Sequence, residues 1–306
     1  MLYYIGKRFL QSLVVIFIVT LFAFVLVHAA PGNPARMMAG EYATDEQVAA
    51  MEERMGFNKP IYEQFWMYLE GLAHGDFGMS VVYNQPVLPI IFSRLPVTVQ
   101  LAVGTVLVAC LLSIPLGVIA GVTRAKFIEF FAMFFALLGQ SMSSLWLGIL
   151  LIYIFAVKLG WLPAIGTGGI EYLILPVLTM GYPMAATLTR VARSGMIDTM
   201  NEDYITATYA KGISNFQVYT KYALRNAMIP VITLIGLDLA MQLSGSVIVE
   251  SVFSRAGVGQ LMNQSVTSRD YAMIQAMLLI SSFLFTFVNF IVDVINSIID
   301  PRLSLY

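Results

Sequence analysis

The feature that most constrains this sequence is a series of apolar runs, each close to twenty residues long or longer. An α-helix needs about 20 apolar residues to cross the hydrocarbon core of a bilayer. Charged residues make up 11% of the chain and hydrophobic residues 58%, whereas soluble domains carry about 25% charged residues. These observations predict an integral membrane protein and exclude an ordinary soluble globular domain.

Hydropathy and periodicity predict six transmembrane helices in an all-α membrane protein. The expected spans are 9–29, 96–122, 127–157, 172–193, 229–253 and 273–299. The third run is too long for one upright span, so we expect it to be tilted or to begin with turns that lie in the membrane surface. No linker or repeat divides the chain, which predicts a single transmembrane domain over 1–306, with a helical loop at 30–95 and core helices at 96–299.

Basic residues indicate which ends of these helices face the cytoplasm. One side carries Lys7, Arg8, Arg124, Lys126, Arg190, Arg193, Lys211, Lys221, Arg225 and Arg302, in short or moderate segments. The loops on the other side are longer and mix basic residues with many acidic ones. The positive-inside rule therefore predicts that both termini and the loop at 194–228 are cytoplasmic, and that 30–95 is extracytoplasmic.

The loop at 194–228 contains a polar, helix-prone stretch, DYITATYAKGIS. Asn201 can cap a short helix, Lys211 falls in its last turn, and Gly212 can take the left-handed conformation that ends a helix. Ser214 then has the capping-box spacing that begins a second short helix.

A bare turn would join the two spans, so two helices are more than a connector needs. One interpretation is a helical hairpin that lies on the surface without a partner. The other is a docking element for a cytoplasmic protein, which presents Tyr204, Ala207, Thr208, Lys211 and Gly212 to a groove.

The extracytoplasmic loop has helical signals of its own. Thr44 and Gln47 have capping-box spacing for a helix that ends near Gly56. Pro60 can open another helix with apolar residues on one face, flanked by Tyr62 and Trp66. One interpretation of this second helix is an amphipathic helix at the membrane surface that packs on its own domain. The other, a platform for a substrate-binding protein, is implied by the family resemblance given below.

Several polar side chains fall at membrane depth, where such groups are costly and tend to face the bundle interior. They are Gln140, Ser141, Ser143 and Ser144 in the third span, Tyr182 in the fourth, and Asp238, Gln242 and Ser246 at four-residue spacing in the fifth. One interpretation is that they line a water-filled translocation path. The alternative is that they form hydrogen bonds between helices, each contributing about 1 kcal/mol.

No group of residues predicts a cofactor or metal site. Cys110 is the single cysteine, and His28 and His74 have no companions at ligand spacing. The chain also lacks a phosphate-binding G-x-x-x-x-G-K-[ST] loop, the usual motif for binding a nucleotide.

The ordered fragments of the sequence resemble one family along essentially the whole chain. They are APGNPAR at 30–36, GDFG at 75–78, the 203–214 stretch with Ala210, Lys211 and Gly212 at its turn, ALRNAMIPVIT at 223–233, IVESVF at 248–253, RAGVGQL at 255–261, RDY at 269–271 and DPRL at 300–303. Together they resemble permease subunits of ATP-binding-cassette (ABC) importers, of the oligopeptide/dipeptide/nickel transport family. Thr206 stands where the wider family has a glutamate.

This resemblance implies a type I ABC importer permease fold and a role without enzyme activity. It implies that 203–212 forms the coupling helix that contacts a cytoplasmic ATPase, through Asp203, Tyr204, Ala207, Thr208, Ala210, Lys211 and Gly212. It also implies a second homologous permease, two ATPase subunits that bind ATP and magnesium, and an extracytoplasmic binding protein. The expected location is a bacterial or archaeal inner membrane, and the expected cargo is peptides, with glutathione or metal chelates as further possibilities.

Two other functions are compatible with parts of the sequence. An ion-coupled secondary transporter would use Asp238 as its coupling carboxylate. An intramembrane enzyme has little support, because no nucleophile, base and orienting group fall at one membrane depth.

Overall fold

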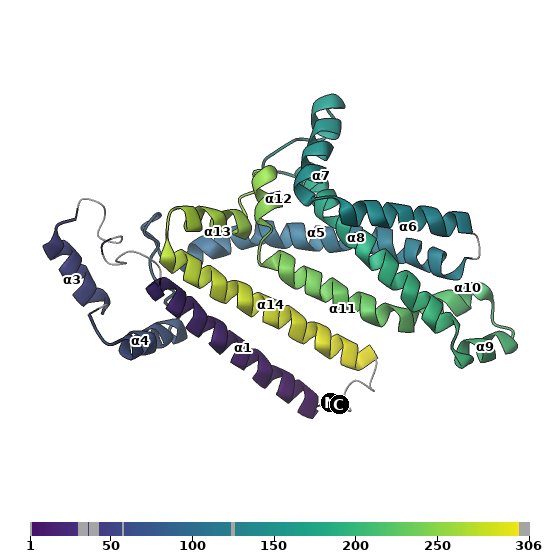
Figure 1. The fold of residues 1–306 in the computed structure, drawn as a ribbon, viewed down its shortest axis with the longest axis horizontal. Coiled ribbons are helices and arrows are strands. Elements are labelled where there is room, and N and C mark those ends of the chain that lie inside the picture. The colour runs from purple at the N-terminus through teal and green to yellow at the C-terminus, as the bar shows by residue number, and fades with distance from the viewer. Residues whose placement is uncertain (1, 30–35, 37–42, 57, 124–125, 300–306) are drawn as a thin grey trace.

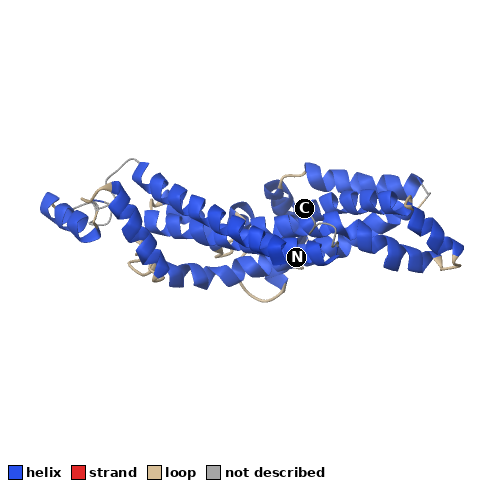
Figure 2. Cartoon of the chain, turned by 90° about the horizontal axis from the view of Figure 1, so that it is seen from below, coloured by secondary structure: helices blue, strands red, loops and turns tan. Residues whose placement is uncertain are grey.

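The computed structural model describes residues 2–29, 36, 43–56, 58–123 and 126–299. Within these ranges the chain is almost wholly helical, and the one β contact is an isolated bridge between Met79 and Pro86. The molecule is elongated (Figure 2). The fragments APGNPA at 30–35 and DPRL at 300–303, the basic residues Arg124 and Arg302, and the two termini lie outside the described residues.

Long helices form the body of the protein; the short helices α3 and α4 lie at one end, α9 and α10 at the other, and α7 and α12 beside the middle (Figure 1). Their bounds are α1 Leu2–Ala29, α3 Asp45–Met55, α4 Ile61–Ala73, α5 Val87–Val122, α6 Lys126–Ser141, α7 Ser144–Leu151, η1 Ile152–Lys158, α8 Glu171–Met200, α9 Asp203–Ala210, α10 Asn215–Gln217, η2 Val218–Ala223, α11 Leu224–Leu243, α12 Val247–Val252, α13 Val258–Thr267 and α14 Tyr271–Ile299. Of the described helices, five are long and apolar enough to cross a membrane, or six if α6, α7 and η1 count as one bent span.

The third predicted span is bent rather than tilted. Met133–Ser141 and Ser144–Lys158 meet at 103°, at the polar stretch that interrupts the apolar run. Ser143 has an extended backbone at the start of α7, and the hydroxyl of Ser141 donates to the carbonyl of Leu137 within α6. The polar residues therefore mark a break between two helices.

Three other predicted boundaries are corrected by the structure. Helix α5 starts at Val87 instead of 96, and α8 continues to Met200 instead of 193, so both helices extend beyond the apolar runs. The fifth span ends at Leu243, and α12 is a separate helix. Ser246 consequently lies outside the helix that carries Asp238 and Gln242.

The centre of the bundle is the close pairing of α5 with α8. A side chain at Gly117 would place its Cβ 2.5 Å from the Cβ of Ala192, so only glycine permits this approach. Such small residues are typical of packed membrane helices, where backbones approach closely. Beside this contact, Ala109, Leu188 and Val231 form a buried cluster that joins α11 to the pair.

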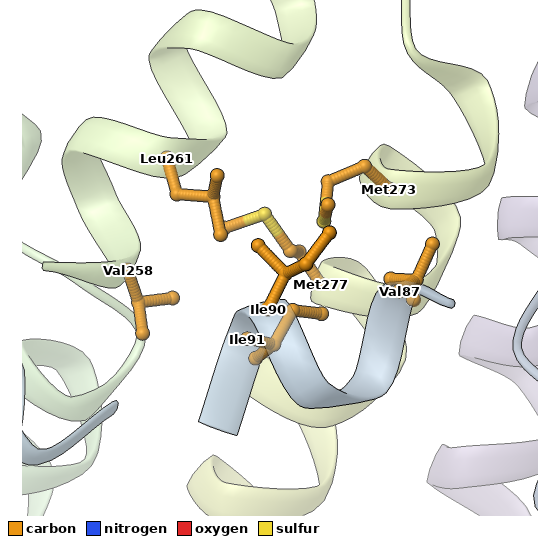
Figure 3. Packing of buried hydrophobic residues seen from close by; sticks show 8 residues of the cluster. Val87, Ile90, Ile91, Val258, Leu261, Met273 and Met277 are labelled. Atoms are coloured by element: carbon orange, nitrogen blue, oxygen red, sulfur yellow. The ribbon is translucent and has the colours of Figure 1, made fainter. Parts of the chain in front are cut away.

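A second apolar cluster closes the end of the molecule where α13 lies. The start of α5, α13 and the start of α14 meet there through Ile91, Leu261, Met273 and Met277 (Figure 3).

The predicted capping box of α3 is confirmed. The side chain of Thr44 accepts from the amide of Gln47, and the backbone amide of Thr44 donates to the Gln47 side chain.

Candidate functional site

The candidate site is the short helix α9, at the opposite end of the molecule from α3, α4 and α13 (Figure 1). It follows α8 almost directly: Asn201 ends α8, and Glu202 occupies the position before α9. The prediction that Asn201 caps the short helix is therefore wrong. Asn201 instead follows the last turn of the longer helix α8. The side chain of Glu202, which precedes α9, makes no capping hydrogen bond.

Helix α9 is followed by the left-handed glycine that the sequence predicts, but Lys211 does not fall in its last turn, because the helix ends at Ala210 and Lys211 is the residue after it. Gly212 has a φ of +75°, in the left-handed region that only glycine adopts without strain. Its amide donates to the carbonyl of Tyr209. The sharp turn lets the chain reverse towards α11.

The second predicted short helix begins at the expected residue but is not a separate element. Ser214 precedes α10, although its side chain makes no capping hydrogen bond. Helix α10 runs through the π-helical segment η2 into α11, and the whole stretch Asn215–Leu243 is a single membrane-length helix. Pro230 lies inside this helix. The loop at 194–228 thus holds one free-standing helix between two long ones.

An apolar cluster fixes α9 to the ends of both long helices. Ile205 of α9 packs with Met196 of α8 and with Val218, Ala223 and Ala227 along η2 and α11. Ile205 is 1% exposed, and burying such a side chain contributes about 1.5–3 kcal/mol. Because α9 contacts both helices, its position is coupled to theirs.

Two residues expected on the docking surface make hydrogen bonds within the chain, although the side chain of Tyr204 stays 38% exposed. Thr208 is buried and its hydroxyl donates to the carbonyl of Tyr204, so the expectation that it is presented outwards is wrong. The Tyr204 hydroxyl accepts a hydrogen bond from Asn226 Nδ2 at 2.8 Å and donates to the Tyr222 carbonyl at 3.4 Å. These contacts tie α9 to the base of α11.

The remaining predicted residues form an exposed surface, which we call the α9 face. It comprises Asp203, Ala207, Ala210, Lys211 and Gly212. Phe216, which is 75% exposed on the adjoining α10, extends the same end of the molecule. Sequence reasoning missed Phe216, although an aromatic residue directly after a polar turn was a usable signal. A polar helix face with a neighbouring exposed aromatic is suited to binding a protein groove.

Burial and a neighbouring phenol perturb one titratable group beneath this face. The pKa of Tyr209 is raised, first by burial and then by the hydroxyl of Tyr219. Both effects favour the neutral phenol of Tyr209.

The predicted pathway residues do not converge on one place. Gln140 accepts from Arg190 at 2.7 Å, and the Tyr182 hydroxyl donates to the Phe135 carbonyl at 2.8 Å, so both lie between α6 and α8. Gln242 instead contacts the sulfur of Met184, between α8 and α11. Ser141 and Ser144 flank the 103° bend, and Asp238 lies half-buried on α11.

A buried carboxylate at the far end was not foreseen. Glu250 of α12 is fully buried and accepts from the Thr98 hydroxyl of α5 and from the Gln260 amide, both at 2.9 Å. The Thr98 hydroxyl in turn accepts from the Val258 amide at 2.9 Å. Burial raises the pKa of Glu250, while these hydrogen bonds oppose the shift. Together the two side chains cap the first turn of α13, whose own preceding residue, Gly257, has no side chain.

The chain is thus a bundle of membrane-length helices with the short helix α9 exposed at one end. The chain belongs to the family described as binding-protein-dependent transport system inner membrane component, whose model matches residues 113–305. The N-terminal model of the same membrane components matches residues 1–102. It is a multi-pass inner-membrane permease of an ABC importer, as the sequence predicts.

Curated relatives match the chain over its whole length. It is 40% identical over 303 residues to the glutathione transport system permease protein GsiC of Escherichia coli (strain K12), covering 99% of each chain. The GsiC protein of Shigella dysenteriae serotype 1 (strain Sd197) matches to the same extent. These relatives are transport permease subunits, which does not favour the ion-coupled alternative.

A solved structure shows the same fold. The MetNI methionine ABC transporter, in an inward-facing conformation, matches with a TM-score of 0.56 and 18% sequence identity. The match covers 69% of this chain and 97% of that one. The expected ABC importer permease fold is confirmed.

Proposed function

We propose that this chain forms half of the translocation pathway of an ATP-driven peptide importer and that α9 is its contact with a cytoplasmic ATPase. A second, homologous permease supplies the other half. Two ATPase subunits bind ATP and magnesium, this chain binds no cofactor itself, and an extracytoplasmic binding protein delivers the cargo. Both termini and the α9 face are cytoplasmic in this arrangement.

The proposal rests on the contacts that hold α9 in the structure. Its outer face is exposed, while Ile205 anchors it to both α8 and α11. An ATPase that displaces α9 therefore displaces two long helices of the bundle with it. Packed helices move as rigid bodies, so the displacement reaches the membrane interior instead of being absorbed in a loop.

The proposed class of cargo rests on the curated relatives. GsiC is named for the transport of glutathione, which is a tripeptide with an amino group and carboxylates. At 40% identity over the full length, a short peptide is the cargo class that the comparison favours. Dipeptides, longer peptides and metal chelates are to be compared with glutathione in binding measurements on the partner binding protein.

Cross-linking tests the contact directly. In a Cys110→Ala background, Ala207→Cys places a thiol at the centre of the α9 face, and we expect it to cross-link to the ATPase in the assembled complex. Glu63→Cys, exposed on α4 at the other end, is the matched control and should give no ATPase adduct. Lys211→Glu should reduce co-purification of the ATPase. Equal cross-linking at both positions, or none at Ala207→Cys, contradicts the assignment.

A further inference from the structure

Helix α4 lies against the C-terminal half of α1. The ring of Phe65 contacts those of Phe17 and Phe24, with centroids 6.3 Å and 5.1 Å apart, and Tyr68 also faces Phe24. His28 Nε2 and Gln64 Oε1 are 2.9 Å apart and add a polar contact near the end of α1. On its other side α1 packs against α14 (Figure 1), so α4 is at the edge of the bundle.

These ring contacts fix the depth of α4 relative to the apolar span. The span of α1 runs over Ile5–Leu26. At 1.5 Å per residue, Phe17 lies about 14 Å and Phe24 about 3 Å inside its end. Phe65 contacts both rings, so it lies between these levels, within the apolar part of α1. A helix that packed above the membrane could not reach Phe17.

The face of α4 next to the one that contacts α1 is apolar and uncovered. Tyr62 and Trp66 are each 70% exposed, and at 100° per residue Leu69 lies beside Tyr62, on the side towards Phe65. Glu63 and Glu70 are exposed along the next strip of the helix. No residue of α4, which is described in full, is buried.

Apolar side chains are also exposed on the same half of α1. They are Phe22, Val25 and Leu26, and Phe22 lies at the depth that Phe65 occupies. Tyr and Trp gather where the hydrocarbon core meets the headgroups, because their rings are apolar and their polar atoms need water or headgroups. On the side that faces α1, burial raises the pKa of Tyr68 to about 12, which fits apolar surroundings.

We propose that α4 is an interfacial helix that binds the phospholipid leaflet at the C-terminal end of α1. Its Tyr62 and Trp66 contact acyl chains and headgroups, while Glu63 and Glu70 face water. An amphipathic helix of this kind is buried about 5–10 Å into the boundary between headgroups and acyl chains. The lipid thus holds in place the segment that connects α1 to α5.

Spin labelling tests the depth of each face. In a Cys110→Ala background, Tyr62→Cys and Glu63→Cys place labels on adjacent residues of the same helix. With the full chain in phosphatidylcholine proteoliposomes, collision of each label with oxygen, which concentrates in acyl chains, is compared with collision with a water-soluble nickel chelate. We expect oxygen to dominate at Tyr62→Cys and the chelate to dominate at Glu63→Cys.

Two results would overturn the proposal. Equal access of the chelate to both labels would place the face in water, and exclusion of both reagents from Tyr62→Cys would show that a protein covers it. A second measurement leaves α4 unaltered: of the three tryptophans in the chain, Trp146→Phe and Trp161→Phe leave Trp66 alone. Its fluorescence should be quenched by phospholipids brominated on their acyl chains, and unchanged emission would contradict lipid contact.

Discussion

At the scale of single residues, the hydrogen bonds of one tyrosine hydroxyl decide how firmly α9 is held. The Tyr204 hydroxyl links α9 to Asn226 and to the Tyr222 carbonyl, both near the junction of η2 with α11. A side chain that seemed from sequence to face a partner therefore makes its polar contacts within the chain. The Tyr204 hydroxyl therefore helps to position α9.

Removing this hydroxyl should loosen the coupling without unfolding the bundle. We expect Tyr204→Phe to cost about 0.5–1.5 kcal/mol, the usual net contribution of a hydrogen bond. In the assembled importer, ATP hydrolysis should continue while the cargo imported per ATP falls. Both rates are measured in the same proteoliposomes.

A double-mutant cycle provides the control. Asn226→Ala should lower the cargo imported per ATP as Tyr204→Phe does. The double variant should be little worse than either single variant, because both substitutions remove the same hydrogen bond. Fully additive losses would show that the two side chains act separately.

Asp238 permits a second test at this scale. The permease family implies that its carboxylate is not the energy-coupling group, so Asp238→Asn should retain ATP-driven uptake. Uptake is measured in proteoliposomes of the complete importer, with ATP and no ion gradient. Loss of uptake in the variant, together with uptake by the native protein driven by a proton or sodium gradient alone, would restore the secondary-transporter hypothesis.

At the scale of elements, helix α13 depends on caps supplied from elsewhere in the chain. Glu250 and Thr98 satisfy the amides of Gln260 and Val258, so α12 and α5 together fix the start of α13. The apolar cluster around Leu261 then holds the helix against α14.

Glu250→Ala should destabilise this end of the molecule. It leaves the Gln260 amide in the first turn without its acceptor, which costs about 1–3 kcal/mol. Thermal unfolding in detergent should shift to lower temperature, and hydrogen exchange should accelerate at the start of α13. Glu63→Ala, at an exposed glutamate, should leave both unchanged. If Glu250→Ala also left them unchanged, the cap would not stabilise α13.

The elements also show what can be predicted from sequence. Thr44 and Gly212 fulfil their predicted roles because a capping box and a left-handed turn depend on a few adjacent residues. Asn201 does not, because where α8 ends is decided by packing: Met196 is buried against η2 and α11, which keeps the helix going past Arg193. The hydrogen bond between Glu250 and Thr98 could not be predicted from sequence, because the two residues are 152 positions apart in the chain.

At the scale of the whole molecule, most of the spans and the short helix α9 were predictable, whereas α12, α13 and the contacts between elements were not. The polar residues at 140–144 were assigned to one span, but they surround a 103° bend, which composition does not encode. Tyr182 and Gln242 were expected to share one path, yet they contact different neighbours on either side of α8.

The molecule as a whole should be inert without its partners. We expect the purified chain in liposomes to accumulate no peptide against a gradient, because no part of its sequence carries a nucleotide-binding loop. Uphill uptake should appear only when the ATPase subunits, the second permease, the binding protein and ATP are supplied. Radiolabelled glutathione provides the measurement, and sustained uphill uptake by this chain alone would refute the proposed role.

The unbroken helix Asn215–Leu243 gives the protein a lever. Its 29 residues span about 40 Å at 1.5 Å per residue. A rod of that length that pivots by about 5° at one end travels about 3.5 Å at the other, more than half a helical turn of 5.4 Å pitch. The turn at Gly245 joins that distant end to α12, so in the proposed mechanism a small rotation at the α9 end moves the opposite end of the bundle.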